Sequence, residues 1–273
     1  MRFGDAELPA GADVVVVGAG LVGLFTAFFA ARAGLGRVVV LERREAVASL
    51  TSAHSAEGFR LEWDAPENVE MVRESADVFE HFAELVGLPG FDAGLRRPGY
   101  LFLTAASGPT YRPALLAQRV RRWRERGLAD VELLTGDEVR RRFRFVNEAV
   151  EEAHFRAADG FVDAGALARG LVRGGGFETY VETPVAAVEV AAGRAAGVRT
   201  TSGRSIAAGA VVLAGGPFTR RLAEAAGAPL PVENRRRHGL ILHLAPGLVD
   251  PSWPMVVDAD LGLYWRPRPE ASS

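Results

Sequence analysis

The sequence predicts an α/β fold, and three observations lead to that prediction. A short β-branched run at 13–17 leads through a glycine-rich loop into an apolar segment of helical length that stops at Gly34. A second apolar run at 37–41 completes a strand–helix–strand unit. Farther along, helical periodicity alternates with β-branched runs, which is typical of a sheet covered by helices.

Composition excludes several classes of function. The chain has 273 residues, 48% hydrophobic and 24% charged, a balance typical of a globular protein with one large or two modest domains. The formal net charge of −2 gives no electrostatic reason to expect a nucleic-acid partner. There is no Cys, which excludes disulfides, thiolate metal sites and cysteine nucleophiles. All 32 basic residues are Arg, which excludes a lysine Schiff base, and no cluster has metal-ligand spacing.

One uncharged stretch, residues 14–31, is almost long enough for a membrane span. Three glycines interrupt it, and acidic residues precede it. We therefore interpret it as a buried strand that turns into a buried helix. With no targeting signal visible, we expect a cytoplasmic protein without a membrane span.

The glycine-rich loop fits the pattern G-x-G-x-x-G between a strand and a helix. Gly18 permits a tight turn, Gly20 lets the backbone approach a pyrophosphate, and Gly23 allows close packing of helix on strand. The free N–H groups of the helix N-terminus then favour the anion. The predicted pyrophosphate loop consists of Gly18, Ala19, Gly20, Leu21, Val22 and Gly23.

A carboxylate stands where such a loop needs one. Glu42 follows Gly23 by 19 residues, at the end of the second strand, and suits the two hydroxyls of an unphosphorylated ribose. This pattern predicts a dinucleotide site but does not by itself separate NAD from FAD.

Local patterns predict further elements. Capping residues are expected at Asp64 with Glu67, at Thr135 with Glu138, and at Asp163. The first cap predicts a helix that reaches residue 86, and Gly193 marks the turn of a hairpin between strands 185–190 and 197–201. The other expected strands are 97–104, 211–214, 240–244 and 261–265, and the other expected helices include 113–126 and 219–226.

The second half of the chain favours FAD, because the hairpin followed by the buried run 211–216 resembles the FAD domain of flavoproteins of the glutathione-reductase type. More specifically, the chain from Asp13 to Pro267 resembles the D-amino-acid oxidase and sarcosine oxidase family, called the DAO family. The matching stretches are residues 18–42, 51–60 (Thr-Ser-Ala-His-Ser-Ala-Glu-Gly-Phe-Arg), 159–163 (Asp-Gly-Phe-Val-Asp), 211–221 and 263–267 (Leu-Tyr-Trp-Arg-Pro).

The resemblance implies a glutathione-reductase-type FAD-binding Rossmann domain with a smaller, incomplete β-rich substrate domain. The FAD-binding segments are expected at 11–95 and 150–228, and the substrate segments at 96–149 and 229–273. It also implies the roles of individual residues. Gly18, Gly20 and Gly23 hold the pyrophosphate, and Glu42 holds the ribose. The remaining implied FAD contacts are Arg43 beside the adenosine, Ser52, Ala53, His54 and Ser55 along the flavin, Val185 at the adenine, and Ala214 and Gly215 on the phosphate side.

The implied reaction is oxidation of a small amine or amino acid such as glycine, sarcosine or a D-amino acid. A hydride leaves the carbon next to nitrogen for flavin N5, and the imine hydrolyses. His54 and Arg60 are the candidate catalytic residues. His54 either bonds covalently to the flavin, as in some relatives, or makes an ordinary hydrogen bond. Arg60 either clamps a substrate carboxylate or forms an ion pair with Glu57 or Glu62.

Members of this family usually continue beyond the stretch 263–267 with more strands of the substrate sheet. A second subunit could supply that part, so a partner-dependent or non-catalytic flavin-binding subunit, or a truncated product, is the main alternative. An NAD-dependent dehydrogenase is a further one. Sarcosine oxidases use a lysine near the flavin to activate oxygen, and this chain has none. We therefore favour a dehydrogenase, or an oxidase that uses another cation.

Overall fold

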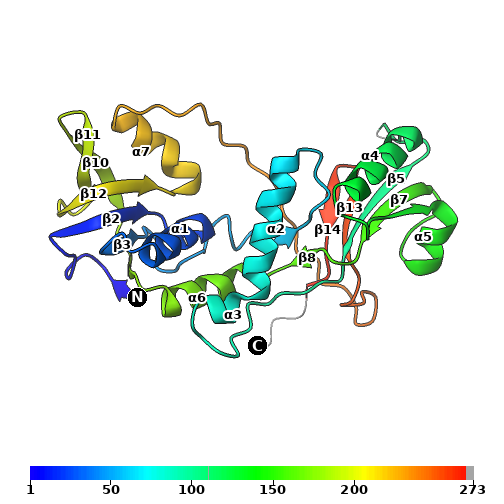
Figure 1. Ribbon diagram of the computed structural model, residues 1–273, viewed down its shortest axis with the longest axis horizontal. Helices are drawn as coiled ribbons and strands as arrows, with labels where there is room; N and C mark the ends of the chain where they lie inside the picture. The colour runs from blue at the N-terminus through cyan, green and yellow to red at the C-terminus, as the bar shows by residue number, and fades with distance from the viewer. Residues whose placement is uncertain (110, 269–273) are drawn as a thin grey trace. The chain divides into compact units, whose positions relative to one another are not determined.

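The computed structural model describes residues 1–109 and 111–268, and the chain divides into two compact units (Figure 1). Unit 1 comprises residues 1–55, 82–93 and 163–239, and unit 2 comprises residues 56–81, 94–162 and 240–273. The last five residues of the expected segment 229–273 lie outside the described residues.

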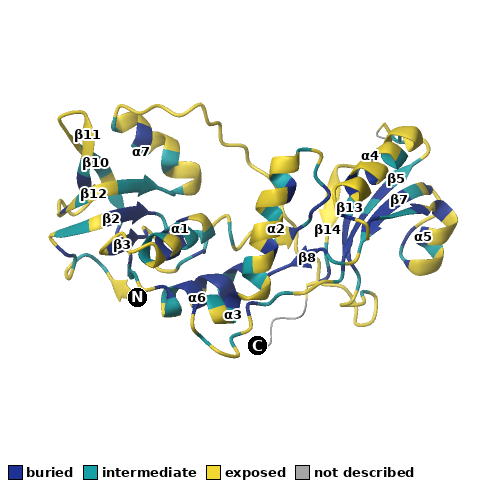
Figure 2. Cartoon of the chain, viewed as in Figure 1, coloured by how far each residue is buried: buried dark blue, intermediate teal, exposed yellow. Residues whose placement is uncertain are grey.

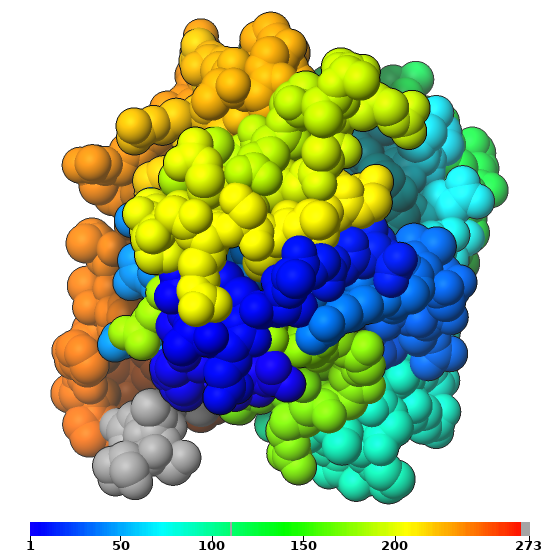
Figure 3. Space-filling view, turned by 90° about the vertical axis from the view of Figure 1, so that its left-hand side faces the viewer, coloured from blue at the N-terminus to red at the C-terminus, as the bar shows by residue number. Residues whose placement is uncertain are grey.

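Unit 1 is built on a seven-stranded sheet of order β1-β9-β3-β2-β12-β11-β10. The five strands from β1 to β12 run parallel, and β11 and β10 continue the sheet antiparallel. The strands are β1 (Arg2–Phe3), β2 (Gly11–Val17), β3 (Val38–Leu41), β9 (Glu178–Val181), β10 (Val185–Ala191), β11 (Arg194–Thr200) and β12 (Ser205–Leu213). Figure 3 shows the yellow residues of β12 beside the dark blue residues near the N-terminus, where β2 pairs with β12. The valines of β2 and β3 are the centre of this core, because β-branched side chains suit a sheet buried on both faces.

Helices cover this sheet. The helices of unit 1 are α1 (Leu21–Arg32), α3 (Phe82–Leu85), α6 (Ala164–Gly174) and α7 (Thr219–Ala225), with a 3₁₀ turn at Gly216–Phe218. Helix α1 packs on β2 and β3, α6 packs on α1, and α7 contacts β10 and β12. The Asp163 carboxylate caps α6 as expected, because its Oδ1 accepts a hydrogen bond from Ala166 N at 2.7 Å.

The expected hairpin is present, and its turn is shorter than the gap between the predicted strands 185–190 and 197–201. Strand β10 extends to Ala191 and β11 begins at Arg194, so two residues make the turn. Ala192 and Gly193 have φ angles of 50° and 74°. Both angles lie in the left-handed region that a two-residue hairpin turn of type I′ requires, and the glycine takes the second without a steric penalty.

Unit 2 contains a five-stranded sheet of order β14-β13-β5-β7-β6 and a two-stranded sheet of β4 and β8. Its strands are β4 (Gly58–Phe59), β5 (Tyr100–Ala105), β6 (Glu132–Thr135), β7 (Val150–Arg156), β8 (Gly160–Phe161), β13 (Met255–Asp258) and β14 (Leu263–Trp265). Its helices are α2 (Pro66–Glu80), α4 (Pro113–Glu125) and α5 (Gly136–Arg142). Figure 2 shows β5 and β7 dark blue, in keeping with their share of the buried core.

Two helix predictions have opposite outcomes. The capping box of Thr135 and Glu138 is confirmed, with both reciprocal hydrogen bonds in place at the start of α5. The box of Asp64 and Glu67 is wrong, because α2 starts at Pro66 after Ala65 without a side-chain cap. The Asp64 carboxylate instead pairs with Arg119 at 3.1 Å. The helix also ends at Glu80, so the predicted single helix to residue 86 is two helices, α2 and α3.

The expected strand at 240–244 is absent. Leu240, Ile241, Leu242 and Leu244 lie in a segment without regular structure and are 54–85% exposed. Figure 2 shows the long segment between α7 and β13 largely in yellow, the colour of exposed residues. An apolar run predicts a strand only when a neighbouring strand is there to pair with it, and in the described part of the chain this run has none.

The two units and the expected domain segments divide the chain differently. Residues 150–162 were assigned to the FAD-binding part, but β7 pairs with β5 and β6 in the sheet of unit 2. Residues 56–81 also belong to unit 2, while 229–239 belong to unit 1. No helix among residues 1–109 and 111–268 is both long and apolar enough to cross a membrane.

Candidate functional site

The backbone of the glycine loop of unit 1 packs closely against the ends of two neighbouring strands, β3 and β12. Gly18 has a φ angle of 109°, and its N–H donates to Leu41 O at 2.8 Å. A Cβ at this position would lie 2.5 Å from Ala214 O, and Ala214 N donates to Val17 O at 2.8 Å. The turn at Gly18 therefore lies directly against the end of β12, which brings Ala214 and Gly215 to the loop as expected.

The next two glycines serve different purposes. A Cβ at Gly23 would collide with Gly18 O, so helix α1 could not pack on the loop with any larger residue. A Cβ at Gly20 would meet only Ser52 Oγ, at 3.6 Å. Gly20 precedes α1, and Ser52 Oγ accepts a hydrogen bond from Leu21 N at 3.3 Å. The N-terminus of α1 is thus open above Gly20 except for one hydroxyl, which leaves space for an anion.

Glu42 is held across this loop. Its carboxylate is 9% exposed, and its two oxygens accept hydrogen bonds from Ala19 N at 2.8 Å and Arg44 N at 2.9 Å. Each carboxylate oxygen has capacity for a second hydrogen bond. The arrangement fixes the carboxylate beside the glycine loop and leaves it able to accept from hydroxyl groups.

The segment that contains Ser52 folds back on the glycine loop. Ala48 N donates to Ala19 O at 2.8 Å, and Ala53 N donates to Ala48 O at 3.1 Å. His54 is exposed, and its Nδ1 lies 2.7 Å from Leu50 O, so the ring donates to its own loop. Ser55 Oγ donates to Ser52 O at 3.1 Å.

Two of the expected cofactor residues lie at the margins. The Arg43 guanidinium lies over the Phe218 ring at 4.3 Å. Val185 begins β10, three strands from β2 in the sheet order, and packs against the core of unit 1. The structure therefore gathers Ser52, Ala214 and Gly215 around the glycine loop and Glu42, but it does not place Val185 beside them.

Arg60 of unit 2 makes neither of the ion pairs weighed for it. Its Nη1 donates to the backbone oxygen of Glu62, and the guanidinium lies 3.8 Å from the Trp63 ring and 5.1 Å from the Phe102 ring. Glu57 instead pairs with Arg266 at 2.5 Å. Burial lowers the pKa of Arg60 from its ordinary value, with nearby acidic groups acting in the opposite direction.

Buried polar residues around Arg60 were not anticipated as a group. Burial raises the pKa of Tyr100 to about 12, and its hydroxyl occupies the space that a side chain at Gly58 would need. Burial and a hydrogen bond to Asp159 raise the pKa of Glu62 to about 9. Burial lowers the pKa of His154 to about 3. These residues come from three separate segments of the sequence, 58–62, Tyr100 and 154–159, so no local pattern joins them.

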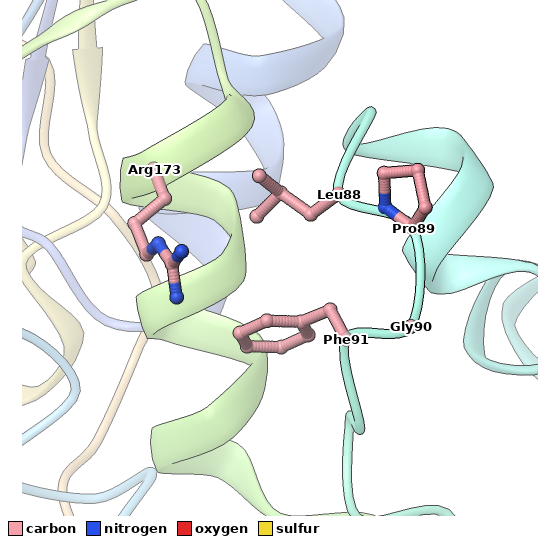
Figure 4. Close-up of a pocket in the computed structure, with 5 residues that line it drawn as sticks. All are labelled: Leu88, Pro89, Gly90, Phe91 and Arg173. Carbon is pink, nitrogen blue, oxygen red and sulfur yellow. The ribbon is translucent and has the colours of Figure 1, made fainter.

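Unit 1 also has an open hollow of about 350 Å³ (Figure 4). Its walls are Leu88, Pro89, Gly90, Phe91 and Arg173. None of these residues belongs to the predicted cofactor loop, and the Phe91 ring and Arg173 guanidinium already contact each other at 5.8 Å. It is a feature apart from the glycine loop.

The sheet, the glycine loop and the fixed acid of unit 1 define a dinucleotide-binding α/β protein of the Rossmann type. The sequence profile of the FAD dependent oxidoreductase family, DAO, matches residues 13–272. The chain belongs to this family, and the family's cofactor is FAD. The predicted fold class is thereby confirmed.

Named relatives agree with this assignment. FAD-dependent oxidoreductase domain-containing protein 1 of Bos taurus is 27% identical over 300 residues, which is 94% of this chain and 60% of the relative. Glycine oxidase of Bacillus licheniformis is 30% identical over 209 residues, which is 74% of this chain and 54% of that enzyme. The chain therefore spans little more than half the length of these curated relatives.

Solved structures show the same fold. Glycine oxidase from Bacillus cereus superposes with a TM-score of 0.64 at 25% identity, covering 78% of this chain and 57% of that one. L-Proline dehydrogenase from P. horikoshii superposes with a TM-score of 0.75 at 21% identity, covering 93% of this chain and 66% of that one. The second likeness, at this identity, concerns the fold alone.

Proposed function

We propose that this chain is the FAD-binding part of an oxidoreductase that oxidises a small amine or amino acid. Glycine, sarcosine, dimethylglycine and D-amino acids are the candidate substrates. The family and the glycine oxidase relatives support the reaction class. The observation that carries the amino-acid assignment is Arg60, whose half-buried guanidinium forms no ion pair within the described part of the chain.

The residues around the glycine loop fit FAD. In this proposal Gly18, Gly20 and Gly23 let the backbone approach the pyrophosphate, and the open N-terminus of α1 binds it. Glu42 accepts from the ribose hydroxyls while its two backbone donors, Ala19 N and Arg44 N, hold the carboxylate in place. When bound, the flavin supplies the acceptor for the hydride that leaves the carbon next to the substrate nitrogen.

Arg60 is proposed to bind the carboxylate of an amino-acid substrate. Trp63 and Phe102 hold the guanidinium plane by stacking, which leaves its remaining N–H groups for a ligand. A bidentate contact would orient the substrate and contribute more than a single point charge. A carboxylate partner within the protein would occupy the N–H groups of Arg60. Neither Glu57 nor Glu62 forms an ion pair with Arg60.

His54 is proposed to act without a covalent bond to the flavin. Its Nδ1 is engaged by Leu50 O at 2.7 Å, which ties the ring to its own turn. Precipitation of the yellow protein with acid should therefore release the flavin into the supernatant. Flavin that stays with the pellet would favour the covalent alternative instead.

A partner-dependent subunit is the second candidate, and one observation favours it. Strand β14 is the edge of its sheet, and Leu263, Tyr264 and Trp265 on it are 39–59% exposed. An exposed apolar edge strand invites pairing with another strand. A second subunit that carries further strands of the substrate sheet would meet that need.

One set of measurements separates these candidates. The purified chain is mixed anaerobically with each candidate amine while flavin absorbance is followed, and size-exclusion chromatography is run with flavin detection. Bleaching by at least one amine supports the proposed reaction. A flavin that stays oxidised with every amine, both alone and with a candidate partner that adds strands beside β14, contradicts it. Bleaching only with the partner favours the second candidate.

A further inference from the structure

Two carboxyl groups are buried together in unit 2. Glu62 is 1% exposed and Asp159 is fully buried. Asp159 Oδ1 accepts a hydrogen bond from Arg156, which also pairs with Asp130 at 2.9 Å. Asp159 Oδ2 and both oxygens of Glu62 are buried and find no donor in the described part of the chain. Burying an ionised carboxylate without a donor is among the most costly arrangements in a protein.

One proton resolves this arrangement. Asp159 acts on Glu62 as a neighbouring acid and raises its pKa, after the larger effect of burial. Two ionised carboxylates offer only acceptors, whereas a protonated carboxyl donates to an ionised one. Asp159 already has the Arg156 guanidinium as its counter-ion, while Glu62 has none, so Glu62 is the group that holds the proton. Burial and Asp159 raise the pKa of Glu62 to about 9, in agreement with this assignment.

The charge of Glu62 matters to Arg60. Arg60 precedes Glu62 by two residues, and its guanidinium donates to the backbone oxygen of Glu62. Arg60 has no other counter-ion in the described part of the chain. An ionised Glu62 would attract the Arg60 guanidinium strongly at low dielectric. The other titratable or charged groups whose influence reaches this cluster are Tyr100, Tyr264, Arg119 with Asp64, Arg156 with Asp130, and His154.

We propose that Glu62 and Asp159 share one proton, and that neutral Glu62 is a positioning residue that leaves the Arg60 guanidinium unpaired for the carboxylate of a small ligand. The shared proton rests on the burial of both acids and on their three oxygens that find no donor in the described part of the chain, and it does not depend on the role of Arg60. The positioning role rests on the proposed function of Arg60. It follows that carboxylate binding weakens at alkaline pH, when Glu62 ionises and competes for Arg60.

The shared proton is tested by infrared difference spectroscopy of the full chain near neutral pH. The wild type should show the carbonyl stretch of a buried, neutral carboxyl group, and the band should disappear at alkaline pH. Glu62→Gln should remove it. Glu132→Gln, an exposed acid of β6, is the matched control and should leave it unchanged. A wild-type band that survives in Glu62→Gln, or no band at all, overturns the shared proton.

The positioning role is tested by calorimetric titration of the FAD-loaded chain with benzoate, from about pH 6 to about pH 10. For the wild type, Kd should be constant at first and then rise about tenfold per pH unit above the pKa of Glu62, because binding there requires the uptake of one proton by Glu62. For Glu62→Gln, Kd should stay within about twofold across the same range. Asp159→Asn removes a neighbouring negative charge, so the rise should begin at lower pH.

The outcomes separate this inference from the function beneath it. An equal pH dependence in wild type and Glu62→Gln overturns the positioning role while Arg60 keeps its proposed contact. Absence of benzoate binding at every pH overturns that contact and the positioning role together, and the infrared result still decides the shared proton. If Glu62→Gln fails to fold, the shift in Asp159→Asn decides in its place.

Discussion

The two candidate sites of this chain are constructed in opposite ways. The glycine loop of unit 1 works by the absence of side chains: Gly18 and Gly23 bring backbone against backbone, and Gly20 leaves a helix N-terminus open. The Arg60 cluster of unit 2 depends on charged side chains: oxygens of Glu62 and Asp159 are buried without a hydrogen-bond donor, and the Arg60 guanidinium has no ion-pair partner in the described part of the chain. The first site is governed by steric fit and the second by charge, so changes in unit 1 should affect FAD, and changes in unit 2 should affect pH dependence and carboxylate binding.

The largest effect is expected from Gly20→Val. A Cβ alone fits beside Ser52 Oγ, so the fold should survive, but a branched side chain occupies the space proposed for the pyrophosphate. We expect loss of FAD, measured as flavin absorbance per protein after gel filtration, with circular dichroism unchanged. Gly239→Val is the control, since its Cβ meets nothing within 4 Å. Stoichiometric FAD in Gly20→Val would contradict the assignment of this loop.

His154→Phe should change how the free energy of unfolding depends on pH in the acid range. His154 stacks on Phe102 at 4.5 Å, and burial lowers its pKa to about 3 from an ordinary 6.5. The unfolded chain therefore binds one proton more between these values, and stability is lost as pH falls through that window. The slope is at most about 1.4 kcal/mol per pH unit. Denaturant unfolding of wild type and variant should diverge below about pH 6.5. Parallel curves would show that His154 does not titrate in this way.

Arg60→Lys tests the cation of unit 2. A lysine keeps the charge but loses the planar fork, so carboxylate affinity should fall roughly tenfold, or about 1.4 kcal/mol. Calorimetry with benzoate measures this change, and Arg142→Lys in an exposed pair is the control. FAD content should be unaltered in both variants. Loss of FAD in Arg60→Lys would break the separation between the two sites.

The smallest effect is expected from Ser52→Ala. Its hydroxyl accepts from Leu21 N at a long 3.3 Å, so its removal should destabilise the fold by about 1 kcal/mol or less. FAD affinity should fall only slightly, because the backbone of the loop remains. Denaturant titration and flavin fluorescence measure the two effects. A large loss of affinity with little change in stability would mean that Ser52 contacts the cofactor more directly than proposed.

The same contrast explains what the sequence could predict. The βαβ unit, the glycine loop and Glu42 were predictable because spacing along one continuous segment determines them. The Asp163 cap and the hairpin at Gly193 were predictable for the same reason. The Asp64 cap failed because Arg119, 55 residues away, competes for the carboxylate. Strand β7 went unpredicted, since its Val-Glu-Glu-Ala-His-Phe-Arg sequence lacks the alternation of a half-buried strand.

The Arg60 cluster could not be predicted for a related reason. Glu62 was considered only as a possible ion-pair partner of Arg60, and nothing near it in the sequence indicates that Asp159 will lie beside it. Burial decides its chemistry, and burial depends on how β5, β7 and the segments around β4 and β8 come together. The roles of individual residues in binding FAD and substrate remain predictions that the experiments above address.

The parallel pairing of β2 with β12 has a consequence for how this protein is made. Residues 14–17 pair with residues 210–213, so the central strand waits for about 200 further residues to be synthesised. At typical rates of translation that delay is roughly 10 to 40 seconds. During it, β2 has only β3 to pair with, and its other edge stays unpaired and open to association with other strands. Slow steps in refolding should likewise follow the closure of this long loop.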